Sequence, residues 1–274
     1  MRHETFQRRF AHALDAIAGL PVEAARQRYD ALCSGFAPAD PAGMTVLDER
    51  IAGVSVRRFQ PAKFKAGPIL YAHGGGWYLG SPRSHHGITA DLAERLGREV
   101  ISVDYRLAPE ASYAEALDDC RRVAEACAPV ALAGDSAGGR LVLDVARQAP
   151  WRGLLGLIYP PVGRLSPATL GPDAPLLSRD DILTLWHAIA GDVPMSDDAS
   201  PPAGCIEILS VERDPLTRPI EIAIAAWRRT GASIGYRCAP GMLHSALHAH
   251  AELPAMHAAW RDFCHALEQR LPKA

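Results

Sequence analysis

The chain has 274 residues, of which 48% are hydrophobic and 22% are charged, and its formal net charge at pH 7 is −2. This length and composition are typical of a globular protein with one sizeable core. Because the sequence contains neither a basic stripe nor a long uninterrupted apolar stretch, neither nucleic acid nor a membrane is an expected partner.

Residues 1–44 are expected to form a helical cap element outside the main sheet. Phe6, Phe10 and Leu14 recur at helical spacing, and a second helical pattern covers residues 22–32. We expect these helices to pack over the active site rather than to join the sheet.

The N-terminal sequence and the cysteines bear on location. Residues 1–20 are interrupted by charged side chains, which argues against a signal peptide. The six cysteines are widely spaced and form no Cys-x-x-Cys pair, so free thiols are expected. The predicted location is therefore the cytoplasm.

From residue 45 onward, short apolar runs alternate with helical patterns. Two strands are expected within residues 45–59, separated at Gly53, and a final helix is expected over residues 250–271. The intervening apolar runs are residues 69–72, 100–103, 130–133, 154–159, 206–211 and 234–236. This alternation predicts a single α/β domain over residues 1–274, with a mostly parallel, doubly wound sheet and helices on both faces.

The first chemical motif is His73-Gly74-Gly75-Gly76-Trp77, directly after an expected strand. Three consecutive glycines allow backbone N–H groups to turn inward, and acyl transfer needs such donors where charge develops on a carbonyl oxygen. His73 is expected to brace this loop through hydrogen bonds. His85 and His86 precede a helix, at the pocket entrance in one interpretation, and the sequence fixes no role for them.

The second motif is Gly134-Asp135-Ser136-Ala137-Gly138, which follows an apolar run. A sharp strand-to-helix turn with glycines on both sides exposes a serine hydroxyl at the edge of a sheet. Ser136 is therefore the predicted nucleophile, and the alternative is an ordinary serine in a turn. Asp135 is interpreted as structural, with its side chain directed away from that of Ser136.

The alternation lapses in residues 161–204, where we expect a lid insertion. Ser178 and Asp181 resemble a capping box at the start of an amphipathic helix that Gly191 ends. Its apolar face would line the substrate pocket. The alternative is that this helix only covers the outer face of the sheet.

Asp214 and His244 each follow a strand-like run, so both are expected at the same sheet edge as Ser136. The chain order Ser, Asp, His is that of an α/β-hydrolase triad. Asp214 could instead be a turn aspartate before a proline, and Glu212 is its nearest competitor. His248 and His250 are interpreted as part of a solvated helix start, and no metal site is predicted.

Five segments resemble the hormone-sensitive-lipase family of esterases, in the order found in that family: residues 73–77, 104–110, 134–139, 214–216 and 243–245. The resemblance covers residues 69–248. It implies an α/β-hydrolase fold and carboxylesterase activity with Ser136, His244 and Asp214 as the triad. It also implies that the amides of Gly75, Gly76 and Ala137 form the oxyanion hole. Residues 104–110 are interpreted as a structural corner with a buried ion pair.

The predicted function is hydrolysis of small, short-to-medium acyl esters through an acyl-enzyme, without a metal or an organic cofactor. An amidase or arylformamidase would use the same triad on another leaving group, and the sequence does not separate these activities. A non-catalytic ligand receptor on the same scaffold would be expected to lack a triad residue. A homodimer is compatible with the sequence, which leaves the oligomeric state open.

Overall fold

The computed structural model describes residues 1–148, 151–189, 191–193 and 199–273. The strands are β1 (Thr45–Ile51), β2 (Val54–Gln60), β3 (Lys65–Ala72), β4 (Arg98–Val103), β5 (Ala131–Asp135), β6 (Leu154–Ile158), β7 (Cys205–Arg213) and β8 (Ser233–Leu243). They form one sheet in the order β1-β2-β4-β3-β5-β6-β7-β8. β2 is antiparallel to both of its neighbours, and the other neighbouring pairs are parallel.

The central strands are mainly apolar, and they are buried apart from the first residues of β3. Leu70 of β3, for example, pairs with Ile101 of β4 on one side and with Leu132 of β5 on the other. Near-continuous apolar runs of this kind are typical of parallel strands covered on both faces. The predicted mostly parallel sheet is confirmed.

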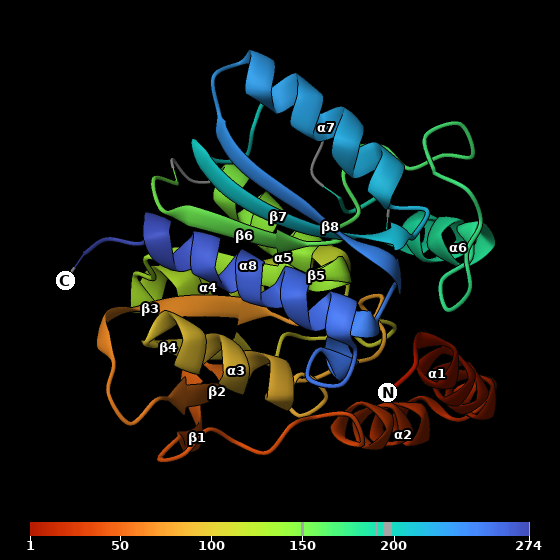
Figure 1. Cartoon of the computed structure of the whole chain (residues 1–274), viewed down its shortest axis with the longest axis horizontal. Coiled ribbons are helices and arrows are strands. Elements are labelled where there is room, and N and C mark those ends of the chain that lie inside the picture. The colour runs from red at the N-terminus through yellow and green to blue at the C-terminus, as the bar shows by residue number, and fades with distance from the viewer. Residues whose placement is uncertain (149–150, 190, 194–198, 274) are drawn as a thin grey trace.

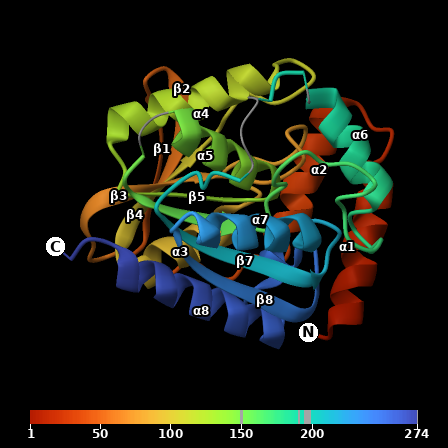
Figure 2. The ribbon, with the colours of Figure 1, turned by 90° about the horizontal axis from the view of Figure 1, so that it is seen from above.

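The helices that cover the sheet are α3 (His86–Leu96), α4 (Tyr113–Cys127), α5 (Ser136–Gln148), α7 (Thr217–Arg229) and α8 (Pro254–Arg270). α3 and α8 pack on one face, and α4, α5 and α7 pack on the other (Figure 2). This is the doubly wound arrangement that the sequence predicts. The last helix begins at Pro254 rather than at residue 250, because residues 246–249 form a separate short 3₁₀ helix, η1 (Ala246–Ala249).

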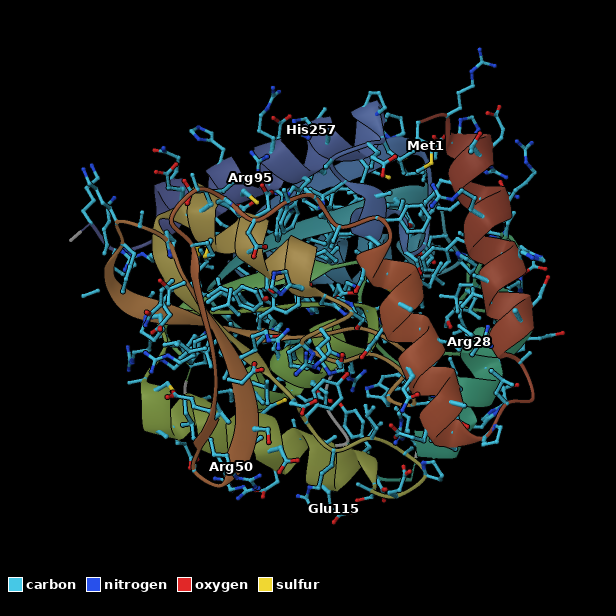
Figure 3. All side chains as sticks on the ribbon, turned by 90° about the horizontal axis from the view of Figure 1, so that it is seen from below. Met1, Arg28, Arg50, Arg95, Glu115 and His257 are labelled. Carbon is cyan, nitrogen blue, oxygen red and sulfur yellow. The ribbon has the colours of Figure 1, made fainter. Side chains whose placement is uncertain are left out.

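Three further helices gather at one end of the molecule: α1 (His3–Ile17), α2 (Val22–Ser34) and α6 (Arg179–Ile189) (Figure 1). α1 and α2 contact each other, and the rings of Phe6 and Phe10 pack against Phe36 at 5.3 and 6.0 Å. α6 begins with the predicted capping box, in which the Asp181 N–H donates to Ser178 Oγ and the Ser178 N–H donates to Asp181 Oδ2, at 3.0 and 2.9 Å. In Figure 3, Arg50 on β1 lies far from Met1 and the N-terminal helix.

None of the helices in the described residues combines the length and the hydropathy needed to cross a bilayer.

Candidate active site

Ser136 stands at the turn between β5 and α5. Its φ is +48°, a left-handed conformation that a non-glycine residue rarely adopts. A Cβ atom at Gly138 would lie only 2.1 Å from the Ala72 carbonyl oxygen, so the first turn of α5 packs directly against the end of β3. The tight turn places Ser136 at the N-terminus of a helix, where the free N–H groups favour negative charge.

The loops after β7 and β8 bring Asp214 and His244 to Ser136. His244 Nε2 lies 2.9 Å from Ser136 Oγ, and His244 Nδ1 lies 2.6 Å from Asp214 Oδ2. The other carboxylate oxygen of Asp214 accepts a hydrogen bond from the Leu216 N–H at 2.9 Å. Because the Asp214 carboxylate can only accept a hydrogen bond, His244 Nδ1 must carry the imidazole proton. Nε2 is then unprotonated and free to accept the serine proton. The three residues predicted from their strand-end positions therefore form one hydrogen-bonded chain.

Glu212, the competitor of Asp214, lies outside this chain. It is exposed on β7, and its Oε2 accepts a hydrogen bond of 2.6 Å from the N–H of Gly241, near the end of β8. Glu212 thus holds the β8 backbone three residues before His244 and does not contact the imidazole in the described hydrogen bonds.

The glycine loop after β3 approaches Ser136 from the other side. Gly75 and Gly76 have φ values of +120° and +64°, and a Cβ at Gly75 would lie 2.2 Å from the Leu79 carbonyl oxygen. Within the described chain, neither of their amides has a hydrogen-bond acceptor. The Trp77 indole N–H donates to the Ala137 carbonyl at 3.1 Å and ties the loop to the nucleophile turn.

A cavity of about 690 Å³ opens beside Ser136 and His244, and Gly75, Gly76 and Ala137 also line it. Its walls include apolar residues of α1, of α6 and of the segment before α6. The apolar residues that these segments contribute to the lining include Phe10, Leu14, Leu165, Leu176, Leu177, Ile182, Leu185 and Trp186. Leu185 lies over the glycine loop, since a Cβ at Gly76 would be 3.0 Å from its Cδ1 atom.

Two contributions to the site were not predicted from the sequence. Tyr159, the residue after β6, packs its ring 4.5 Å from the His244 ring and lines the cavity. The indole hydrogen bond of Trp77 is the second. The position of Tyr159 could have been inferred from the sequence, because it directly follows a parallel strand whose carboxyl end lies at the same sheet edge as Ser136. The direction of the Trp77 side chain has no sequence signature.

The expectations for four histidines have mixed outcomes. His73 braces the glycine loop as predicted, because its Nδ1 lies 2.9 Å from the Gly74 carbonyl oxygen. The pKa of His73 is lowered to about 3, mainly by burial and to a smaller extent by the nearby His85. The prediction that His248 and His250 are solvated is wrong: both are buried, because η1 packs beneath α2, α3 and α8. His85 is fully buried and bonds Asp135, so it does not lie at the pocket entrance.

The predicted buried ion pair in residues 104–110 is only half buried. Arg106 pairs with buried Asp119 at 2.8 Å, but the arginine side chain itself is 46% exposed. Glu110 pairs at the surface with Arg26 of α2. The corner thus fastens α2 through Arg26, whose side chain is 20% exposed, and α4 through the more exposed Arg106.

The chain resembles known proteins in sequence and in fold. A protein-family profile described as alpha/beta hydrolase fold matches residues 69–248. The chain belongs to the α/β-hydrolase family. Carboxylesterase NlhH of Mycobacterium tuberculosis is 31% identical over 221 residues, which are 68% of each chain. Esterase LipI of the same organism is 30% identical over 52% of this chain and 51% of its own length.

Solved structures agree with the family membership. A hormone-sensitive lipase from a metagenome library superposes with a TM-score of 0.83 at 26% identity, over 99% of both chains. The predicted resemblance to hormone-sensitive-lipase-like esterases is confirmed. The chain matches about half the length of the first curated relatives, between 43% and 51%.

Proposed function

We propose that this α/β-hydrolase is a carboxylesterase in which Ser136 is the nucleophile, His244 the general base and Asp214 the residue that orients His244. The observation that carries the proposal is the unbroken chain from Asp214 through His244 to Ser136 Oγ, beside a cavity that can hold a substrate. Two relatives of the chain are named as esterases, Carboxylesterase NlhH and Esterase LipI, and these names support an ester as the substrate.

The proposed reaction has two halves. His244 Nε2 takes the Ser136 proton as Oγ bonds to the ester carbonyl carbon, and it then gives that proton to the departing alcohol as the C–O bond breaks. Water next gives a proton to Nε2 as its oxygen bonds to the carbonyl carbon of the acyl-serine. Nε2 then returns that proton to Ser136 Oγ as the bond between Oγ and the carbonyl carbon breaks, which releases the carboxylic acid and restores the free serine. Asp214 holds the imidazole in the useful tautomer and stabilises the imidazolium.

The amides of Gly75, Gly76 and Ala137 are proposed to bind the oxyanion of both tetrahedral intermediates. Loss of one such donor typically raises the barrier by about 3–4 kcal/mol. Support comes from the loop geometry, because these amides border the cavity next to Ser136.

We propose small, uncharged esters with short-to-medium acyl chains as substrates. On a single domain spanning residues 1–274, residues 1–44 would act as a cap and residues 161–204 as a lid. Within the lid, residues 190 and 194–198 lie outside the described structure. The apolar walls from α1 and α6 favour an aliphatic group.

Six free thiols are compatible with the predicted cytoplasmic location. The homodimer also stays a prediction.

The alternatives receive no specific support. An amidase or arylformamidase would use the same chain of hydrogen bonds, and no described contact selects an amide over an ester. A non-catalytic receptor would be expected to have lost a triad residue, whereas Ser136, Asp214 and His244 are all present.

The test is hydrolysis of p-nitrophenyl acetate, butyrate, octanoate and dodecanoate, beside an aryl amide and a formylanilide. We expect turnover of the short and medium esters, and a loss of about 10⁶-fold in kcat for Ser136→Ala. Ser55→Ala, on β2 and outside the cavity, is the control and should retain full activity. Unchanged turnover by Ser136→Ala would reject the nucleophile, and a preference for the amide would reject the substrate class.

A further inference from the structure

Asp135 and His85 form a buried polar cluster directly behind Ser136, and neither has a role in the proposed reaction. The side chains of His85 and Asp135 are 0% and 4% exposed. Asp135 is the last residue of β5 and His85 immediately precedes α3. A carboxylate in such a place is costly to bury unless its oxygens are hydrogen-bonded.

The carboxylate of Asp135 is held by three groups from the chain on either side of the glycine loop. Its Oδ1 accepts from the Tyr71 hydroxyl at 2.7 Å and from the Gly74 N–H at 2.9 Å. Its Oδ2 lies 3.2 Å from His85 Nε2, and His85 Nδ1 lies 2.9 Å from Ser84 Oγ. The carboxylate thus joins the nucleophile turn to the strand and the loop that precede Gly75.

The fit between Asp135 and Gly74 leaves no free space. A Cβ atom at Gly74 would lie within 2.4 Å of Asp135 Oδ2. The carboxylate therefore packs directly against the Gly74 backbone. Gly74 immediately precedes Gly75, the first proposed oxyanion amide, and Asp135 immediately precedes Ser136. Movement of the glycine loop relative to Ser136 would have to break this contact.

The ionised state of Asp135 is favoured in spite of its burial. Burial alone would raise the pKa of this carboxyl, but the nearby His85, with hydrogen bonds from His85 and Tyr71, holds the pKa well below its usual range. An ionised carboxylate accepts stronger hydrogen bonds than a neutral acid.

We propose that Asp135 is a positioning residue that acts through Gly74 to keep the amides of Gly75 and Gly76 at a fixed distance from Ser136 Oγ. The inference rests on the proposed function, because it assumes that these amides bind the oxyanion. His85 and Tyr71 hold the carboxylate in place. Since oxyanion stabilisation operates in the transition state, a loosened loop lowers kcat and leaves substrate binding largely intact.

The experiment compares Asp135→Ala with Asp135→Asn on p-nitrophenyl butyrate. Asp135→Ala should lower kcat by about 10²-fold with KM changed by less than about threefold. It should also weaken inhibition by a trifluoromethyl ketone, whose tetrahedral adduct with Ser136 carries an oxyanion, by a similar factor. Asp135→Asn should retain at least about a tenth of the wild-type kcat. Its amide oxygen still accepts from Gly74 and Tyr71, and its NH₂ can donate to the other tautomer of His85.

Asp119→Ala is the matched control, because Asp119 is an equally buried carboxylate that bonds Arg106 and Arg122 away from the cavity. It should lower the unfolding midpoint and leave kcat within about twofold. Should Asp135→Ala fail to fold, Tyr71→Phe removes a single donor to Oδ1 and should lower kcat alone, by about three- to tenfold.

Three outcomes would overturn the inference: an unchanged kcat in Asp135→Ala or Tyr71→Phe, an equal loss in Asp135→Asn, or an equal loss in Asp119→Ala. Each of these requires a wild-type chain that hydrolyses the ester. A wild-type chain without ester hydrolysis would instead overturn the proposed function, and the inference with it.

Discussion

Two histidine–aspartate pairs flank Ser136, and they differ in what the second imidazole nitrogen faces. In the pair His244–Asp214, Nδ1 bonds the carboxylate at 2.6 Å and Nε2 faces Ser136 Oγ at the wall of the cavity. In the pair His85–Asp135, Nε2 faces the carboxylate at 3.2 Å and Nδ1 faces the buried hydroxyl of Ser84.

The same two side chains therefore serve different ends according to their surroundings. The first pair keeps one nitrogen free for a proton that must move, beside a cavity that admits substrate and water. In the second pair, both nitrogens are engaged by protein groups and the His85 ring is fully buried, so neither nitrogen faces a substrate in the cavity. Chemistry of this kind needs access as much as it needs the right residue types.

The largest effect that separates the pairs is expected from removing each histidine. His244→Ala should lower kcat by about 10⁵- to 10⁶-fold, because no base remains for Ser136. Its free energy of unfolding should change less than that of His85→Ala, because His244 lines the cavity and removal of its imidazole admits water to the otherwise buried Asp214 carboxylate. His85→Ala should lower kcat by only about tenfold and destabilise the fold by about 2–3 kcal/mol, because it removes a partner from a buried carboxylate. Kinetics and urea unfolding of both variants test this, and equal kinetic losses would contradict it.

A smaller effect is expected from the acid of the pair His244–Asp214. Asp214→Asn should lower kcat by about 10³- to 10⁴-fold, because an amide favours the wrong tautomer of His244. Glu212→Gln, on the strand β7 that precedes Asp214, is the control and should stay within about threefold, since its amide oxygen can still accept from Gly241. Steady-state kinetics on p-nitrophenyl butyrate check both variants. A loss that is larger for Glu212→Gln would reassign the acid.

The pair His244–Asp214 could be predicted from the sequence, because each of its residues occupies the same position in a repeating pattern. Asp214 and His244 each follow an apolar run, and parallel strands bring their carboxyl ends to one edge. The capping box of Ser178 and Asp181 was equally readable, because both partners lie within one turn of helix.

The buried pair could not be predicted, because its contacts cross the chain. Asp135 meets His85 fifty positions away, and His248 meets Tyr29 of α2 at 3.5 Å across 219 positions. A histidine-rich stretch such as residues 244–250 is polar in sequence, and only the packing of η1 beneath neighbouring helices makes it interior. Burial of this kind follows from tertiary packing and leaves no local pattern.

The smallest expected effect concerns the buried side and is seen in stability rather than in activity. The ring of His248 lies 4.7 Å from that of His85. The pKa of His248 is lowered to about 3, mainly by burial and to a smaller extent by His85. In the unfolded chain an ordinary histidine titrates near 6.5. Between these two values the unfolded state binds the extra proton, so stability is complete above about pH 6.5 and falls as the pH is lowered towards 3.

His248→Asn should therefore reduce the slope of unfolding free energy against pH by about 1.4 kcal/mol per pH unit between about pH 4 and 6. The matched control is His257→Asn, which removes an exposed histidine of α8 (Figure 3) that loses no burial on unfolding, so the slope should stay unchanged. Urea unfolding at several pH values measures both slopes. Because the prediction concerns a slope, a general loss of stability in His248→Asn does not obscure it. An unchanged slope in that variant would mean that His248 accepts its proton in the folded state, which would place water beside the buried pair and remove the contrast with His244.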